Sequence, residues 1–213
     1  MVSDVLDVSD GRLARGNRTR EQLLESALKL FGERGFYATT MKDLAKDAGV
    51  SPPAVYNHFD SKESVLFAAL IWGLQRFKTF VIDVDDTELA SLERLEGVVK
   101  RHTRNQIMFS GRARFVDRLL DAVSAGELLD PPRRDAITRM RVAYQQLVDG
   151  LIADVTQNSS RSMPPVHVCR AAILNLCDRS PQWVQSGKNV VSTEDVEEDV
   201  WFLVRGMLGV ERA

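Results

Sequence analysis

The sequence has few of the residues on which disulfide-linked, metal-binding or catalytic proteins depend. Its two cysteines, Cys169 and Cys177, lie too far apart along one predicted helix, at about 1.5 Å rise per residue, to bridge within it. Its 3 histidines are scattered. No H-x-x-x-H or C-x-x-C spacing, G-x-S-x-G elbow or phosphate-binding glycine loop occurs. We therefore expect buried thiols, no metal, no cofactor and no enzymatic activity.

The chain also lacks a large net charge and a long apolar run. Its formal net charge is −2, so any affinity for DNA has to come from a local basic patch. No basic leader followed by an apolar stretch opens the sequence, and no run approaches the roughly 18 apolar residues of a membrane-spanning helix. We expect a cytoplasmic protein that does not enter a membrane.

No segment alternates apolar and polar residues as a strand does, and helical spacing continues almost to the end of the chain. With 213 residues, of which 44% are hydrophobic, the chain can bury a sizeable core. We expect an all-α protein of about nine helices. After residue 60, the predicted helices are 61–81, 89–109, 112–125, 133–156, 166–185 and 193–209.

Residues 39–62 are the most informative segment, because they predict two short helices joined by a turn at a glycine. The first helix should begin at Met41, with Thr40 as its N-cap and Asp43 as the acid of a capping box. Gly49 stands where the chain needs a left-handed residue to leave that helix. The spacing is typical of a helix-turn-helix.

The second helix of this pair should begin at Pro52, with Ser51 as its N-cap. Val55 and Phe59 are four residues apart and should face inward. The remaining side chains are then free to meet DNA: Pro53, Ala54, Tyr56, Asn57 and His58.

A helix-turn-helix presents the N-terminal residues of its second helix to base edges, while its first helix crosses the phosphate backbone. Asn57 is suited to a base edge, and Tyr56, His58 and Lys62 are suited to phosphates. The alternative is an ordinary packing motif in which Tyr56 and His58 only cover the core. The predicted DNA-contacting set is Arg18, Thr40, Met41, Ser51, Pro52, Pro53, Ala54, Tyr56, Asn57, His58 and Lys62.

Upstream of this motif, Thr19 and Gln22 predict a capping box for a helix that ends at Arg34, before Gly35. Residues 1–16 read as a disordered arm, either a solvated leader or a basic segment that lies along phosphates. The three helices within 17–62 should enclose one small core: Leu24, Leu28, Phe31, Phe36, Leu44, Val55 and Phe59.

The string TREQLLESALKLFGERGFYATTMKDLAKDAGVSPPAVYNHFDSKESVLFAAL, residues 19–70, resembles the N-terminal domain of the TetR (tetracycline-repressor-like) family of regulators. This resemblance implies that Thr40 and Lys62 touch phosphates and that residues 52–58 enter the major groove. Pro52 and Pro53 depart from the family, which more often carries Lys, Arg, Gly or Ser followed by a small residue.

By the same resemblance, residues 63–213 form a helical effector-binding and dimerisation domain. The last two helices of such proteins build a four-helix dimer interface, here with apolar faces that include Val200, Trp201, Val204 and Met207; the alternative is that these faces only close the core of one subunit. The segment SPQWVQSGKNVVSTEDVEEDVWFLVRGML also resembles a TetR branch with regulators of fatty-acid and steroid catabolism, several of which respond to CoA thioesters.

A regulator of this kind needs a mostly apolar cavity with a few polar anchors. Most residues that could line such a cavity could equally be core residues or partners in surface salt bridges. The predicted ligand-binding set is Trp72, Phe77, Arg104, Met108, Phe109, Phe115, Tyr144, Asn175 and Trp183, with Arg112 and Arg114 as further partners for an acidic ligand.

The sequence thus predicts a homodimeric regulator, most simply a repressor, that binds double-stranded DNA at an inverted repeat and is released by a small-molecule effector. Two heads would read successive major grooves about 34 to 36 Å apart. The alternatives are a helical ligand-binding protein without specific DNA recognition and a small-molecule-modifying enzyme.

Overall fold

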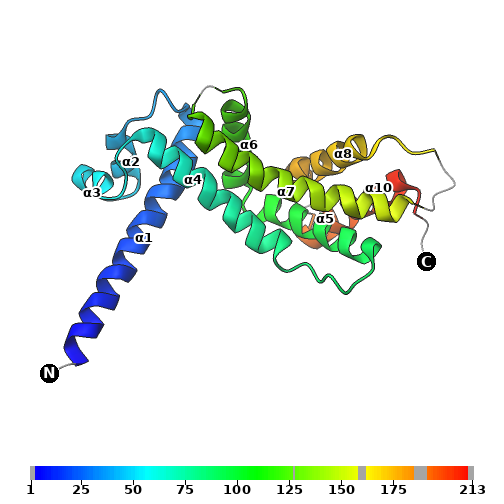
Figure 1. Cartoon of the computed structure of the whole chain (residues 1–213), viewed down its shortest axis with the longest axis horizontal. Helices are drawn as coiled ribbons and strands as arrows, with labels where there is room; N and C mark the ends of the chain where they lie inside the picture. The colour runs from blue at the N-terminus through cyan, green and yellow to red at the C-terminus, as the bar shows by residue number, and fades with distance from the viewer. Residues whose placement is uncertain (1–2, 127, 158–161, 185–190, 211–213) are drawn as a thin grey trace. The chain divides into compact units, whose positions relative to one another are not determined.

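A computed structural model describes residues 3–126, 128–157, 162–184 and 191–210, and for residues 3–15 the backbone alone. All of the regular structure in these residues is helical (Figure 1). The all-α prediction is confirmed, and ten α-helices, of which α9 has four residues, agree with the expected nine or so. The elements are α1 Ser3–Arg34, α2 Met41–Asp47, α3 Pro52–Tyr56, α4 Lys62–Phe77, the π-helical turn η1 Lys78–Ile82, α5 Ser91–Met108, α6 Ser110–Ser124, α7 Pro131–Thr156, α8 Val166–Arg179, α9 Pro181–Val184 and α10 Thr193–Leu208.

The chain forms two compact units, and their boundary differs from the predicted division at residue 62. The first unit comprises Met1–Gly73 and Arg114–Asp135, and the second comprises Leu74–Ala113 and Ala136–Ala213. The division falls inside α4, and the first unit also takes in α6 from Arg114 onward and the start of α7. The predicted functional division at residue 62 stays a prediction.

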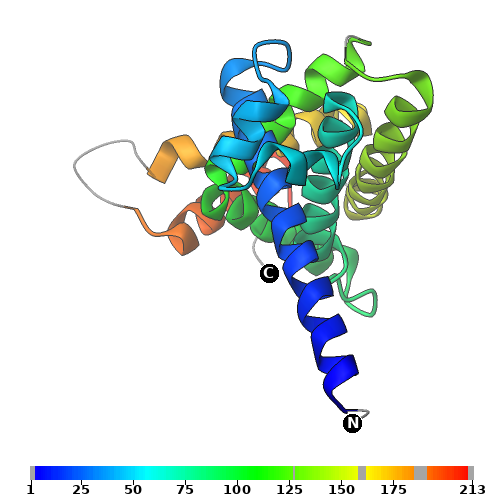
Figure 2. The same cartoon turned by 90° about the vertical axis from the view of Figure 1, so that its left-hand side faces the viewer.

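The first unit has the predicted three-helix core, with α2 and α3 beside the C-terminal half of α1 (Figure 2). Apolar side chains spaced three or four residues apart give each helix one inward face. All seven predicted core residues are buried: Leu24, Leu28, Phe31, Phe36, Leu44, Val55 and Phe59.

Helix α1 begins at Ser3, so the predicted start of this helix at the Thr19 capping box is wrong. The segment predicted as a disordered arm is helical over its described residues 3–16, and Thr19 lies inside the helix instead of capping it. The physical reason is that no proline interrupts this segment. Gly11 and Gly16 each weaken a helix by only about 1 kcal/mol.

The second unit is built around α5, α8 and α10, which pack on one another. Its core contains Leu95, Val98, Ile173 and Val200. Cys169 and Cys177 are free and buried there, as predicted.

Helix α4 continues into η1, and the span Lys62–Ile82 is long and apolar enough to cross a membrane by length and composition, with a hydropathy of 1.5. The expectation that no segment approaches this criterion is therefore wrong. A buried core helix of a soluble protein passes the same test. Val65, Leu66, Ala69 and Leu70 of this span are buried in the protein.

Candidate nucleic-acid interface

The N-terminus of α2 carries the predicted capping box. The Thr40 hydroxyl oxygen accepts a hydrogen bond from the Asp43 backbone N–H at 3.1 Å, and the Asp43 carboxylate accepts one from the Thr40 backbone N–H at 2.9 Å. The Thr40 hydroxyl also donates to this carboxylate at 2.6 Å. These hydrogen bonds from Thr40 lower the pKa of Asp43. A phosphate at Thr40 would therefore compete with Asp43 for the hydroxyl proton.

The turn between α2 and α3 follows from one glycine. Gly49 has φ +68°, in the left-handed region that glycine adopts without strain. Beyond it, the Val50 N–H returns to the Ala45 carbonyl at 2.9 Å and satisfies one of the free carbonyls at the end of α2. This turn sets the angle at which α3 leaves α2.

Helix α3 begins at Pro52, as predicted, but its N-cap differs from the expected one. The Ser51 backbone has the extended conformation of an N-cap, whereas its side chain makes no capping hydrogen bond. Since Pro52 and Pro53 have no N–H, few amides at this end need a partner. The Ala54 N–H donates to the Ser51 carbonyl at 2.9 Å.

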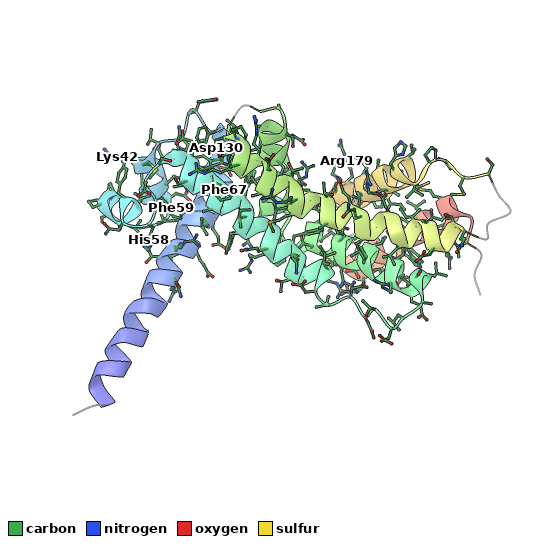
Figure 3. The ribbon with its side chains drawn as sticks, viewed as in Figure 1. Lys42, His58, Phe59, Phe67, Asp130 and Arg179 are labelled. Carbon is green, nitrogen blue, oxygen red and sulfur yellow. The ribbon has the colours of Figure 1, made fainter. Side chains whose placement is uncertain are left out.

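The side chains of α3 divide between core and surface as the spacing predicts. Val55 and Phe59 are buried, whereas Tyr56 is 57% exposed. Figure 3 shows Phe59 turned toward α1 and His58 nearby at the end of α3. Of the other predicted contacts, Pro52, Pro53 and Asn57 are exposed, and Ala54 and His58 are half-buried.

Lys62 has a role that the sequence does not reveal. Its ammonium donates to the carbonyl oxygens of Phe36 at 2.8 Å and Thr39 at 2.9 Å, and it lies 4.4 Å from the centre of the Phe36 ring. These contacts hold the loop between α1 and α2 to the start of α4. The predicted phosphate contact of Lys62 would have to share an ammonium that this loop already engages.

Two exposed side chains beside the N-terminus of α2 are missing from the predicted set. Tyr37 is 75% exposed, although the sequence analysis gave it no contact with DNA. Lys42 is exposed one residue beyond Met41, which is itself half-buried (Figure 3). Tyr37 combines an aromatic ring with a hydroxyl and lies shortly before the N-cap Thr40. This was the signal in the sequence that could have identified it as a candidate contact. Arg18 is exposed on α1.

The acidic groups of α2 are both occupied locally. Asp43 closes the capping box, and Asp47 accepts a hydrogen bond from the Lys29 ammonium at 2.7 Å. Local pairing weakens the repulsion that these carboxylates would exert on a phosphate. The face that α2 and α3 offer to a partner thus has exposed hydroxyl, amide and ammonium groups.

In the second unit, two of the predicted ligand residues lie in an aromatic cluster around His102. The ring centroid of Phe77 is 5.0 Å from that of His102 and 5.0 Å from that of Tyr144. The Tyr144 hydroxyl is 3.0 Å from His102 Nδ1, and Asp178 Oδ1 is 3.0 Å from His102 Nε2. We refer to His102, Tyr144, Asp178 and Gln106 as the histidine node, since Gln106 Nε2 also donates to Asp178 at 2.7 Å.

The titration of His102 reflects two opposing influences. Burial by itself lowers the pKa of His102, whereas Cys177 and the hydrogen-bonded Asp178 raise it, with a result of about 10. Burial raises the pKa of Tyr144 well above its ordinary value. The node therefore holds a buried imidazolium between a carboxylate and a phenol at neutral pH.

The other predicted ligand residues do not gather around this node. Arg104 makes two hydrogen bonds of 2.7 Å to the Glu197 carboxylate, so an acidic ligand would have to share this guanidinium, and the predicted ligand contact of Arg104 stays a prediction. Met108 is 58% exposed, and Asn175 is exposed with its side-chain N–H on the Ala171 carbonyl. Neither lines the interior of the unit.

The four other predicted aromatics have separate surroundings. Phe109 packs edge to face on Phe80, with a centroid distance of 6.0 Å, and the Arg112 guanidinium lies 5.2 Å from its ring centre. Trp183 packs against the core of the second unit. Trp72 and Phe115 belong to the first unit. Phe115 packs so tightly on Gly32 that a Cβ atom added to Gly32 would lie 2.5 Å from the Phe115 side chain. The predicted contact of Phe115 with a ligand stays a prediction.

The predicted dimer faces of α8 and α10 are only partly available. Val200, Trp201 and Val204 are buried in the core of the second unit, which agrees with the alternative that these faces close the core of one subunit. Met207 is exposed. Other exposed apolar side chains on the same two helices are Val168, Phe202 and Leu203.

Known proteins match this chain in both of its parts. Residues 23–69 match the family model of bacterial regulatory proteins of the tetR family, and residues 88–208 match that of the tetracyclin repressor-like C-terminal domain. The second match alone spans more than half of the chain. The chain belongs to the TetR family. Proteins of this family are DNA-binding transcriptional regulators, so the ligand-binding protein without DNA recognition has no support.

Individual relatives agree with this assignment. The transcriptional repressor KstR2 of Mycolicibacterium smegmatis is 30% identical over 195 residues, which cover 88% of this chain and 89% of that protein. KstR2 of Mycobacterium tuberculosis (strain CDC 1551 / Oshkosh) is 40% identical over 86 residues, 38% of this chain but only 41% of that protein.

Solved structures of TetR-family proteins share the fold. The ketosteroid transcriptional regulator KstR2 of M. tuberculosis has a TM-score of 0.73 and 22% identity, covering 91% of this chain and 95% of that one. AibR in complex with isovaleryl coenzyme A and operator DNA has a TM-score of 0.71 and 19% identity, covering 89% and 98%.

Proposed function

We propose that this TetR-family regulator is a cytoplasmic repressor that binds an inverted-repeat operator as a homodimer and leaves it when an effector binds the second unit. The observation that carries the proposal is α3, a short helix with a buried inner face and an exposed outer face that starts at Pro52, behind a capped α2. Such a helix matches the probe that a helix-turn-helix inserts into the major groove.

For the effector we propose an acyl-CoA thioester. Support comes from the resemblance of the C-terminal segment to regulators that respond to CoA thioesters, and from relatives named as a ketosteroid regulator and as a complex with isovaleryl coenzyme A. Within the second unit, the aromatic pair Phe80 and Phe109 with Arg112 over the ring joins apolar surface to a cation. An acyl group and a CoA phosphate need these two features.

Release from DNA requires that the effector bind one arrangement of the dimer better than the other. A coupling free energy of about 1 to 3 kcal/mol would change operator affinity by roughly 5- to 150-fold. By linkage, operator DNA would weaken effector binding by the same factor, so both affinities need to be measured.

The test of DNA binding uses a labelled fragment from upstream of the protein's own gene. We expect saturable binding that prefers this fragment over random DNA and weakens steeply as salt rises. The variant Asn57→Ala should lose preference for the fragment, whereas Val84→Ser, an exposed apolar position in the second unit, should bind as the wild type does. Equal binding to random DNA would overturn the proposal.

The test of the effector titrates short-chain, long-chain and steroid-derived acyl-CoAs into the preformed complex with operator DNA. One class should release the protein, while free coenzyme A at the same concentration should not. Arg112→Ala should raise the concentration that is needed, and Arg139→Ala, at an exposed position of the second unit, serves as its control. If no thioester releases DNA while the operator is bound specifically, the effector class is wrong and the regulator assignment stands.

A further inference from the structure

The loop between α1 and α2, residues 35–40, lies outside the helices and depends on side chains to satisfy its carbonyl oxygens. The Thr39 hydroxyl donates to the Gly35 carbonyl at 2.9 Å. The Thr39 N–H donates to the Phe36 carbonyl at 3.4 Å, which is long for a hydrogen bond. Backbone carbonyls that are removed from water need a partner. The loop therefore needs further donors to hold one conformation.

Lys62, at the start of α4, provides these donors. Its ammonium donates to the Phe36 carbonyl at 2.8 Å and to the Thr39 carbonyl at 2.9 Å, and the Tyr37 carbonyl lies 3.5 Å away. We call the Lys62 ammonium together with the carbonyl oxygens of Phe36, Tyr37 and Thr39 the lysine latch. The latch joins α4 to a loop that is 23 to 26 residues earlier in the chain.

The latch occupies the ammonium on several sides. A lysine ammonium has three N–H donors and no acceptor, and the three carbonyls of the latch can take all of them. The centre of the Phe36 ring also lies 4.4 Å from Nζ, within the range of a cation–π contact. Lys62 is half-buried. A phosphate oxygen that approached this ammonium would have to displace a loop carbonyl, which would then lose its partner.

The latch holds the loop directly before the helix-turn-helix begins. Thr39 is fully buried, and the next residue, Thr40, is the N-cap of α2. Helix α2 in turn packs on α3. A shift of the Thr39 carbonyl would therefore move the start of α2 and, with it, α3. In a helix-turn-helix both helices have to be in place at once, because the first crosses the phosphate backbone while the second enters the major groove.

We propose that Lys62 serves operator binding as a positioning residue, which fixes the place of α2 and α3 through the lysine latch and makes no contact with phosphate itself. This inference rests on the proposed DNA binding by the helix-turn-helix. It departs from the phosphate contact that the family resemblance implies for Lys62. Attraction to phosphates then comes from other cations of the first unit, among them Lys42, which is exposed on α2.

The first test asks whether a positive charge at position 62 is sufficient. Lys62→Met removes the ammonium and keeps an unbranched side chain, whereas Lys62→Arg keeps the charge. Arginine binds phosphate at least as well as lysine does, but its donors are spread over a planar group and cannot converge on three carbonyls as one ammonium does. We expect both variants to bind the operator about tenfold more weakly than the wild type, a difference of about 1.4 kcal/mol.

The second test measures operator affinity over a series of salt concentrations. Each phosphate contact contributes about 0.9 to the slope of the logarithm of affinity against the logarithm of salt concentration. Lys42→Met removes the same charge from an exposed position and should lower the slope by about 0.9. Lys62→Met should weaken binding and leave the slope at its wild-type value, because the ammonium that it removes contacts loop carbonyls.

Amide hydrogen exchange of the full-length protein shows whether the effect is local. In both Lys62 variants, the amides of residues 36–44 should exchange faster than in the wild type. The amides of residues 23–31, in the part of α1 that carries the core of the first unit, should keep their wild-type rates. This pattern separates a displaced loop from a unit that has lost its fold.

Three results would overturn the inference while DNA binding stands. They are wild-type operator affinity in Lys62→Arg, a slope lowered by about 0.9 in Lys62→Met, and exchange that is equally faster throughout residues 23–44 in both variants. In each case the wild type still selects its operator, so the proposed function is unaffected. If the wild type selects no operator, the proposed function fails and the positioning role fails with it.

Discussion

The two compact units bury different kinds of side chain. Around Leu24, Leu44 and Val55, the core of the first unit is apolar, and the polar side chains buried in this unit, Ser26 and Thr39, are uncharged hydroxyls. The second unit buries His102, Gln106 and Glu197 among its apolar residues, each with a charged or hydrogen-bonding partner. An apolar core responds little to pH or to polar ligands, whereas buried ionic contacts can be rearranged by both. The difference suits a rigid DNA-reading unit and a responsive effector unit.

The largest effect should follow from breaking the apolar core of the first unit. Leu44→Ala removes a fully buried side chain, so we expect the free energy of unfolding of this unit to fall by about 2 to 5 kcal/mol. Operator binding should fall with it. Thermal unfolding followed by circular dichroism gives the measurement, and Leu89→Ala, at an exposed position, is the control. Equal effects of the two variants would contradict the assignment of Leu44 to the core.

A smaller effect should come from the ion pair between α5 and α10. Glu197 has a side chain only 4% exposed, whereas that of its partner Arg104 is 44% exposed. Arg104→Ala leaves a buried carboxylate without its partner, so we expect a loss of about 1 to 3 kcal/mol at pH 7, discounted for the solvent around Arg104. Urea denaturation provides the measurement.

Lys100→Ala is the matched control, because it removes a partner of the exposed Glu198. We expect this variant to lose less stability than Arg104→Ala does. Equal losses for the two variants would contradict this account of the buried ion pair.

The histidine node predicts a dependence of protein stability on pH. In the folded protein the pKa of His102 is raised to about 10, above its ordinary value of 6.5. A raised pKa means that the folded state binds the proton more tightly than the unfolded state does. The resulting stability is fully present below about pH 6.5 and is lost as pH rises through about 10. Unfolding midpoints between pH 6.5 and 10 measure it, with an expected loss of about 1 to 3 kcal/mol.

Asp178→Asn is the control that separates the node from other titrating groups. Without the carboxylate, the proton on His102 is held less tightly, so the loss should begin at lower pH. The raised pKa of Tyr144 acts in the same direction only at higher pH, because its ordinary value is already 10.0. If Asp178→Asn and the wild type have the same pH profile, His102 is not the group responsible.

Local signals in the sequence predicted much of the fold and part of the candidate site. The N-cap at Thr40, the left-handed turn at Gly49 and the start of α3 at Pro52 depend on neighbours within a few residues, which the sequence displays directly. The spacing of Val55 and Phe59 predicted, for the same reason, that the side chains of both residues are buried, although α3 ends at Tyr56 and Phe59 follows it.

Features that depend on distant partners could not be predicted in this way. Glu197 lies 93 residues from Arg104, and nothing near either residue indicates the pair. Lys62 reaches carbonyls 23 and 26 residues back in the chain, on a loop whose path the sequence does not give. The prediction of where α1 starts was wrong for another reason. A segment without proline can extend a helix even where no capping signal or apolar face favours it.

The smallest expected change in stability comes from removing the N-cap side chains of the helix-turn-helix, Thr40 and Ser51. Thr40→Ala removes the hydroxyl that accepts from the Asp43 N–H, so we expect a loss of about 1 kcal/mol in the stability of the first unit. Ser51→Ala should cost almost nothing, because the Ser51 side chain makes no capping hydrogen bond and the prolines after it have no amide to satisfy. Urea denaturation of both variants measures the difference. An equal loss would mean that Ser51 caps α3 in solution.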